Sequence, residues 1–146
     1  LDQTISNSSQ IQGVGGSSSS SAAGGSMPPN NNNNNNSKKD KVKELSDEIS
    51  EDYKQNFKCE EYADALENKM KENSISGERI RVTPKTGKSI IYSDKFGTIG
   101  ESGVHDAIKV GDYIFDNMNP NGVPYAEWFS DLGGELYNTI KVIRSW

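Results

Sequence analysis

The fold is decided by residues 104–117, whose sequence is VHDAIKVGDYIFDN. Two short runs rich in β-branched and aromatic residues, 104–110 and 113–117, flank Gly111, and this pattern predicts a β-hairpin. Side chains alternate between the two faces of a strand. The register of the hairpin therefore decides which of its polar residues lie together.

Two polar residues of this hairpin are expected on one face of the sheet. If residues 110–111 form the turn, His105 lies directly opposite Asp116, and if residues 111–112 form it, the two are diagonal neighbours. A three-residue loop without a bulge would put them on opposite faces. A carboxylate beside an imidazole orients the ring and holds one tautomer, as a general base requires. Taken alone, the pair is equally compatible with a surface histidine beside a turn.

Helical patterns precede the hairpin. One amphipathic helix is predicted over residues 39–54 with Ser37 as its N-cap, and a second from about Lys58 to Asn73, ending before a turn at Gly77. The apolar positions recur at spacings typical of a helix: Val42, Leu45, Ile49 and Tyr53 in the first, and Cys59, Tyr62, Ala63, Leu66 and Met70 in the second.

The remaining segments alternate as strands do, with loops between them. Strands are predicted at 79–83 and 89–92, a loop with little regular structure around Gly97, Gly100 and Gly103, a turn at 119–122, a short helix after Pro124 with Trp128, Phe129 and Leu132 on its inner side, and a final strand within 136–146. Helices followed by an antiparallel sheet predict an α+β fold.

The composition divides the chain in two. Residues 1–37 contain no basic or aromatic residue and one acid, and we interpret them as a disordered low-complexity linker before a domain at 38–146.

A net charge of -5 disfavours nucleic acid as a partner, and no apolar run approaches the length of a membrane-spanning segment. One cysteine and one histidine leave too few ligands for a zinc site, so we expect no metal and no cofactor. The chain begins at Leu1 without a signal peptide, and we expect it to be the carboxy-terminal piece of a longer protein.

Cys59 is the one residue with strong nucleophilic chemistry. It lies in the first turn of the second predicted helix, where free backbone N–H groups and the helix dipole favour the thiolate. By itself it is also typical of a small buried apolar residue, and that interpretation is the simpler one. A nucleophile at a helix start, a base on a strand and an acid on the next strand, in the order Cys59, His105, Asp116, match papain-like and transglutaminase-like cysteine enzymes.

The segments around these residues resemble the papain fold toxin domains, the carboxy-terminal warheads of bacterial polymorphic and contact-dependent toxins. The resemblance covers roughly residues 53–132 and rests on FKCEEYA at 57–63, GVH at 103–105, IFDN at 114–117, and NPNGVP at 119–124 followed by Trp128. It implies a papain-like fold with Cys59 as nucleophile, His105 as base and Asp116 as orienting acid.

The same resemblance implies a biological setting. A secreted or cell-surface protein would deliver the domain into a neighbouring cell, where it would act on a protein substrate in the cytoplasm. The producing cell would make a cognate immunity protein, expected to cover the cleft near Cys59 and His105. Residues 1–37 would join the delivery portion to the toxin domain, and no recognisable motif before the domain identifies the delivery system.

The sequence leaves two further roles open: the oxyanion-site amide and the group that orients His105. Gln55, four residues before Cys59, is the candidate amide for the oxyanion site, with Asn56 as its neighbour; exposed helix-end residues are the alternative. Asn117 is the alternative to Asp116 as the group that orients His105.

The hypothesis from the sequence is a cysteine enzyme that cleaves acyl or amide bonds through a thioester. Peptide hydrolysis ranks first, and glutamine deamidation and transglutamination use the same three residues. The alternative is a non-catalytic protein-binding module in which Cys59 is a core residue. A toxin nuclease is disfavoured by the acidic charge and the single histidine.

Overall fold

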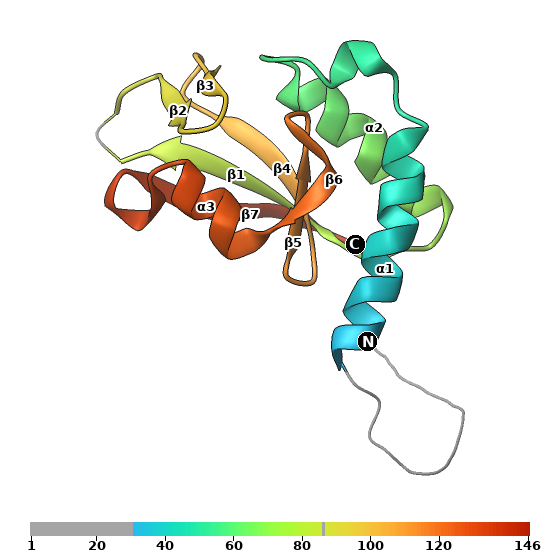
Figure 1. The fold of residues 1–146 in the computed structure, drawn as a ribbon. Coiled ribbons are helices and arrows are strands. Elements are labelled where there is room, and N and C mark those ends of the chain that lie inside the picture. Colours follow the sequence, from blue (N-terminus) through green and yellow to red (C-terminus); the bar gives the residue numbers. More distant parts are fainter. Residues whose placement is uncertain (1–30, 86) are drawn as a thin grey trace. The chain divides into compact units, whose positions relative to one another are not determined.

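Helices pack against a mainly antiparallel sheet in the computed structural model, which describes residues 31–85 and 87–146 (Figure 1). The elements are α1 (Asn31–Asp47), η1 (Glu51–Tyr53), α2 (Cys59–Glu72), β1 (Glu78–Pro84), β2 (Ile91–Ser93), β3 (Gly97–Gly100), β4 (His105–Val110), β5 (Tyr113–Asp116), β6 (Asn119–Pro124), α3 (Tyr125–Asp131), η2 (Gly134–Leu136) and β7 (Asn138–Ser145). The predicted linker lies outside the described residues as far as residue 30, and its last positions, 31–37, are helical. The prediction of an α+β fold is confirmed.

The predicted hairpin lies inside the main sheet. Its five strands follow the order β6-β5-β4-β1-β7, and β2 and β3 form a separate pair. Val110 lies opposite Tyr113, so residues 111–112 form the turn, which is one of the two registers that the sequence allowed. Continued along the strands, this register makes Asp116 a diagonal neighbour of His105 on the same face.

Two apolar clusters lie on opposite faces of this sheet. On one face, Val42 and Leu45 of α1, Ile49 just after that helix, and Tyr62, Ala63, Leu66 and Met70 of α2 pack on Ile108, Val110 and Phe115. On the other face, Ile91 of β2, Ile99 of β3, Trp128 of α3 and the following Leu132 pack on Ile80, Val82, Ala107, Ile114 and Val123 of the sheet. Figure 1 shows α2 and α3 on the two sides of the strands. Among the described helices, none has both the length and the apolar character that crossing a membrane requires.

The two predicted helices form, but the bounds of the first were wrong. α1 begins at Asn31 and ends at Asp47, so Ser37 lies within the helix and does not cap it. The chain after α1 forms a separate short 3-10 helix, in which the Ser50 side chain accepts a hydrogen bond from the Asp52 N–H. Tyr53, which was predicted on the apolar face of the first helix, is exposed. The second helix agrees with its prediction, and every residue of its predicted apolar face is buried.

Two segments predicted as loop and turn are strands. The glycine-rich stretch around residue 97 contains β3, which pairs with β2, and the segment at 119–122 belongs to β6. β6 is an edge strand, where Pro120 is tolerated because one side of the strand needs no ladder hydrogen bonds. Gly122 has a φ of 89°, and a Cβ there would lie 2.8 Å from the ring of Phe115. Close packing on that ring therefore requires the glycine. The final strand, β7, agrees with its prediction.

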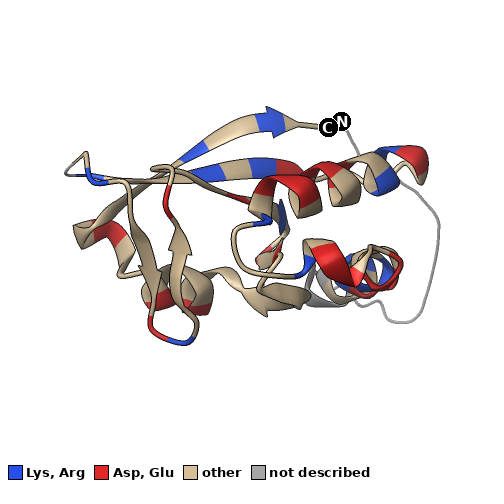
Figure 2. Cartoon of the chain, turned by 90° about the horizontal axis from the view of Figure 1, so that it is seen from above, with Lys and Arg blue, Asp and Glu red and all other residues tan. Residues whose placement is uncertain are grey.

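A buried ion cluster joins α2 to β1 and β4. Asp106 is fully buried, and its carboxylate accepts hydrogen bonds from Arg79 Nη2 at 2.8 Å and from Arg81 Nε at 2.7 Å. Arg79 also pairs with Asp64 and Glu67 of α2. In Figure 2, acidic positions are red along the helix beside the sheet and basic positions are blue on the neighbouring strands. The cluster therefore fixes the helix on the sheet through compensated charges as well as apolar contacts.

We expect Asp106→Asn to lower the free energy of unfolding by about 3 kcal/mol, because it leaves two arginines without their shared carboxylate. Urea unfolding followed by tryptophan fluorescence measures this change. The matched control is Asp47→Asn, which removes an exposed pair with Lys43 and should change stability by less than about 0.5 kcal/mol. Equal effects of the two substitutions would show that the buried cluster adds nothing beyond a surface ion pair.

Candidate active site

Cys59 is the first residue of α2. Lys58 precedes it as the N-cap and makes no side-chain capping bond within the described residues. The cysteine is 8% exposed and belongs to neither apolar cluster of the described residues. Its sulfur therefore lies at a helix N-terminus, beside the backbone N–H groups of the first turn.

His105 and Asp116 meet on one face of the sheet, as the hairpin register requires. His105 is the first residue of β4 and Asp116 the last of β5, and both side chains are buried. The ring atom Nε2 lies 2.9 Å from Asp116 Oδ2. Since a carboxylate accepts hydrogen bonds, Nε2 carries the proton of this contact, and the ring orientation is fixed.

The Asp116 carboxylate accepts hydrogen bonds from several elements. Besides His105, the indole N–H of Trp128 in α3 donates to Oδ2 at 2.8 Å. Oδ1 accepts from the backbone N–H groups of Met118 at 3.1 Å and Asn119 at 2.7 Å, and from the Asn119 side chain at 2.9 Å. A buried carboxylate with this many donors stays ionised and is held in one position.

The electrostatics of the pair favour a charged imidazole and a charged carboxylate. Burial raises the pKa of Asp116, but the hydrogen bonds and the charge of His105 outweigh it, and the pKa lies below its usual range. Burial lowers the pKa of His105, whereas Asp116 and the neighbouring Cys59 raise it, to about 9. At neutral pH the ring is therefore protonated.

Cys59 lies next to this ring. Its side chain acts on His105 both as a hydrogen-bonding group and, when ionised, as a negative charge. The second ring nitrogen, Nδ1, is buried and has no hydrogen bond of regular geometry among the described residues. The Cys59 side chain is thus close enough to the imidazole to raise its pKa.

The loop before Cys59 is held by amide side chains. Asn117 is fully buried, and its Nδ2 donates to the backbone carbonyl of Gln55 at 2.7 Å. The Asn56 side chain donates to the Thr98 carbonyl of β3 at 2.8 Å, so its amide is engaged in fixing the loop. Gln55 is exposed, and no hydrogen bond engages its side-chain amide among the described residues. Asn117 thus fixes the loop, while Asp116 contacts His105.

Two kinds of contact to Asp116 were not predicted from the sequence: the one from Trp128 and those from the turn after Asp116. Trp128 was interpreted as core, which its burial bears out, but its indole N–H also holds the carboxylate. Nothing in the local pattern signals a contact twelve residues away. The hydrogen bonds from the Met118 and Asn119 N–H groups close an Asx turn on the Asp116 carboxylate. Aspartate forms such turns often, because its short side chain reaches the backbone N–H groups that follow it.

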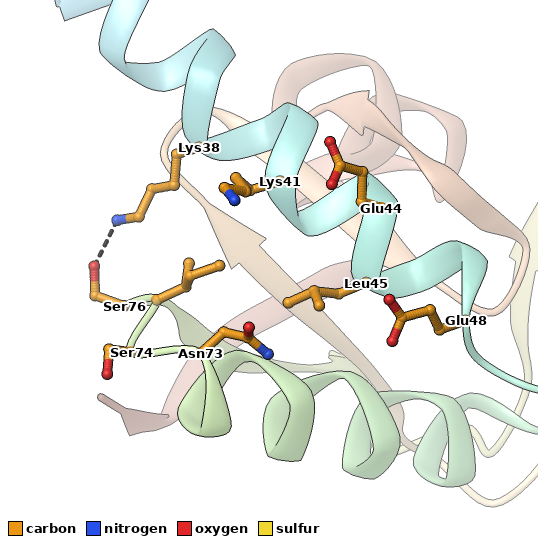
Figure 3. Close-up of a pocket in the computed structure, with 9 residues that line it drawn as sticks. Lys38, Lys41, Glu44, Leu45, Glu48, Asn73, Ser74 and Ser76 are labelled. Carbon is orange, nitrogen blue, oxygen red and sulfur yellow. Dashed lines mark hydrogen bonds between the residues drawn. The ribbon is translucent and has the colours of Figure 1, made fainter.

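A separate hollow of about 380 Å³ lies between α1 and residues 73–76 (Figure 3). Both signs of charge line it, and the Lys38 ammonium donates to Ser76 Oγ at 2.5 Å. Burial lowers the pKa of Lys38. None of the candidate active-site residues lines this hollow. In the described part of the chain, no group of three or more metal-ligating side chains is arranged around a common point.

Comparison with protein-family models matches residues 40–133 to papain fold toxin 2. This range covers more than half of the chain and includes Cys59, His105 and Asp116. Comparisons with curated proteins and with solved structures gave no match. Helices packed on an antiparallel sheet agree with a papain-like fold. The chain belongs to the papain fold toxin 2 family.

Proposed function

We propose that this toxin domain is a papain-like cysteine enzyme that hydrolyses amide bonds in proteins, with Cys59, His105 and Asp116 as its catalytic triad. One observation carries the proposal. The only cysteine and the only histidine of the chain lie side by side although many residues separate them, and the histidine is held by a buried carboxylate. Membership of a papain fold toxin family supports a cysteine enzyme.

The geometry supports a defined sequence of proton transfers. Asp116 holds the proton on Nε2, so Nδ1 is the atom that exchanges a proton with Cys59. A ring with a pKa of about 9 keeps a proton at neutral pH, and Cys59 reacts in its thiolate form. The thiolate attacks the carbonyl carbon, Nδ1–H protonates the departing amine, and a thioester remains on Cys59. Water, deprotonated by the ring, then releases the acid.

The oxyanion of the intermediate needs hydrogen-bond donors. The backbone N–H of Cys59 at the start of α2 is one candidate, and the exposed amide of Gln55 is the other. Attack on a glutamine side chain would give deamidation, and an amine acceptor in place of water would give transglutamination. Peptide hydrolysis ranks first because of the papain-like fold.

The alternative of a non-catalytic binding module has less support. A core cysteine would pack among apolar side chains, whereas Cys59 lies beside a protonated imidazole. A cognate immunity protein, delivery from a secreted or surface protein and action in the cytoplasm of a target cell complete the proposal. Membership of a toxin family supports the immunity partner and delivery to target cells.

Cys59→Ser should abolish toxicity while leaving the fold intact, because the oxygen nucleophile is far less reactive and the side chains are similar in size. Expression of the whole chain in bacteria, scored for growth and for new protein termini, tests this, and circular dichroism checks the fold. Glu60→Gln, at the neighbouring exposed position, is the control that should remain toxic. Undiminished growth arrest by the serine variant would refute the proposed nucleophile. Deamidated or cross-linked proteins without new termini would replace peptide hydrolysis by the related chemistries.

His105 should link stability to pH. Its pKa rises from 6.5 to about 9 on folding, so its contribution is complete below pH 6.5 and is lost as the pH rises through about 9. The free energy of unfolding should fall by about 3 kcal/mol across this window. Urea unfolding at a series of pH values measures the slope. His105→Gln should remove the slope, and Cys59→Ala should keep the part due to Asp116. A slope unaffected by His105→Gln would rule this linkage out.

Trp128→Phe should reduce the reactivity of Cys59 because it removes the indole N–H from Asp116 and keeps an aromatic ring. We expect the rate of alkylation by iodoacetamide at pH 7 to fall by about tenfold, since a partner that orients a catalytic group is disturbed. Phe129→Leu, on the same helix and without a contact to the carboxylate, is the control and should leave the rate unchanged. Equal rates in the two variants would assign Trp128 to packing alone.

A further inference from the structure

The turn just before Cys59 contains a backbone conformation that its residue does not favour. The Lys58 N–H donates to the Gln55 carbonyl at 3.2 Å and closes a four-residue turn. Phe57 has a φ of 67°, while Asn56 has a negative φ. This sign pattern is that of a type II turn, whose third position is normally glycine or asparagine. A phenylalanine there is strained.

Contacts from the sheet hold the turn in this form. Asn56 Oδ1 accepts the Phe57 N–H at 3.1 Å, and its Nδ2 donates to the Thr98 carbonyl at 2.8 Å. Asn117 donates to the Gln55 carbonyl at 2.7 Å. The surrounding structure therefore fixes the turn on both sides of the strained residue.

The strained backbone of Phe57 does not bury its side chain. Phe57 is 48% exposed and belongs to neither apolar cluster of the described residues. Ser74, the other described non-glycine residue with a positive φ, has a structural reason. It follows the C-cap residue of α2, where the Ile75 N–H donates to the Met70 carbonyl at 2.9 Å in the manner of a Schellman motif. Phe57 lacks such a reason, and backbone strain without structural benefit is characteristic of functional sites.

We propose that Phe57 determines substrate specificity by receiving an apolar side chain of the peptide next to the amide that Cys59 attacks. This inference rests on the proposed function. Phe57 and Cys59 are two residues apart, so their Cα atoms lie within about 7 Å of each other, within the reach of one substrate residue. The fixed turn presents the ring at little cost in conformational entropy, and an aromatic ring offers a large apolar contact.

Peptidyl acyloxymethyl ketones test the proposal on the whole chain. The thiolate of Cys59 displaces the carboxylate of the probe, so a C–S bond forms as the C–O bond breaks and the carboxylate leaves with the electron pair. The probes differ only in the residue beside the ketone: leucine, phenylalanine, alanine or aspartate. Wild-type protein should react faster with the leucine and phenylalanine probes than with the other two.

Phe57→Asn keeps a residue that tolerates a positive φ and removes the ring. It should lower the rate with the leucine and phenylalanine probes by about tenfold and leave the rate with iodoacetamide unchanged. Phe57→Tyr should retain the preference. Equal probe rates in the wild type and in Phe57→Asn would overturn the inference. Failure of wild-type Cys59 to react with iodoacetamide or any probe would instead overturn the proposed function, and this inference with it.

Phe57→Gly separates a role in binding from a role in folding. Glycine relieves the strain, so the melting temperature should be unchanged or higher while the preference for apolar probes is lost. A lower melting temperature together with an unchanged preference would make the ring a structural element and refute the proposal.

Discussion

The buried carboxylate of Asp116 constrains the rest of this structure. A charge with almost no exposure is tolerated only when donors surround it, and here they come from β4, from α3 and from the start of β6. Each donor requires its element to be in place. The hairpin must have the register that puts His105 beside Asp116, and α3 must pack so that the Trp128 indole reaches Oδ2. The hydrogen bonds that orient the imidazole therefore also specify how this face of the sheet is covered.

Cys59 lies on α2, outside the sheet that carries His105 and Asp116. A few polar contacts set its position relative to that sheet. Ser46 of α1 hydrogen-bonds the Tyr62 hydroxyl of α2 at 2.6 Å and the Pro120 carbonyl of β6 at 2.6 Å. Asn117 fixes the loop that leads into α2. Asp116 and Asn117 are neighbours in sequence, and one positions the imidazole while the other positions the segment before the thiol. The end of β5 thus connects the two halves of the candidate site.

The candidate site was more predictable than the fold around it. Side chains alternate between the faces of a strand, and a short turn joins the two strands, so His105 and Asp116 were expected on one face. The observed register is one of the two that the sequence allowed. The strands β3 and β6 were wrongly predicted as loop and turn, because glycine, proline and asparagine are typical of turns. Both strands pair with the strand just before them, so residues that resemble a turn lie inside a tight hairpin. The beginning of α1 was wrong because Ser37, although a favoured N-cap residue, lies inside a helix that begins at Asn31.

By itself, the sequence determined the local periodicities: the apolar face of α2, the hairpin of β4 and β5, the final strand and the acidic charge of the chain. These follow from residue spacing and composition, which need no knowledge of partners. Only the tertiary structure decided that Trp128 donates to Asp116, that Arg79 and Arg81 share Asp106, and that the thiol of Cys59 lies beside the ring of His105. Each of these contacts joins residues on different elements, and burial makes each one strong because water no longer competes for the same groups.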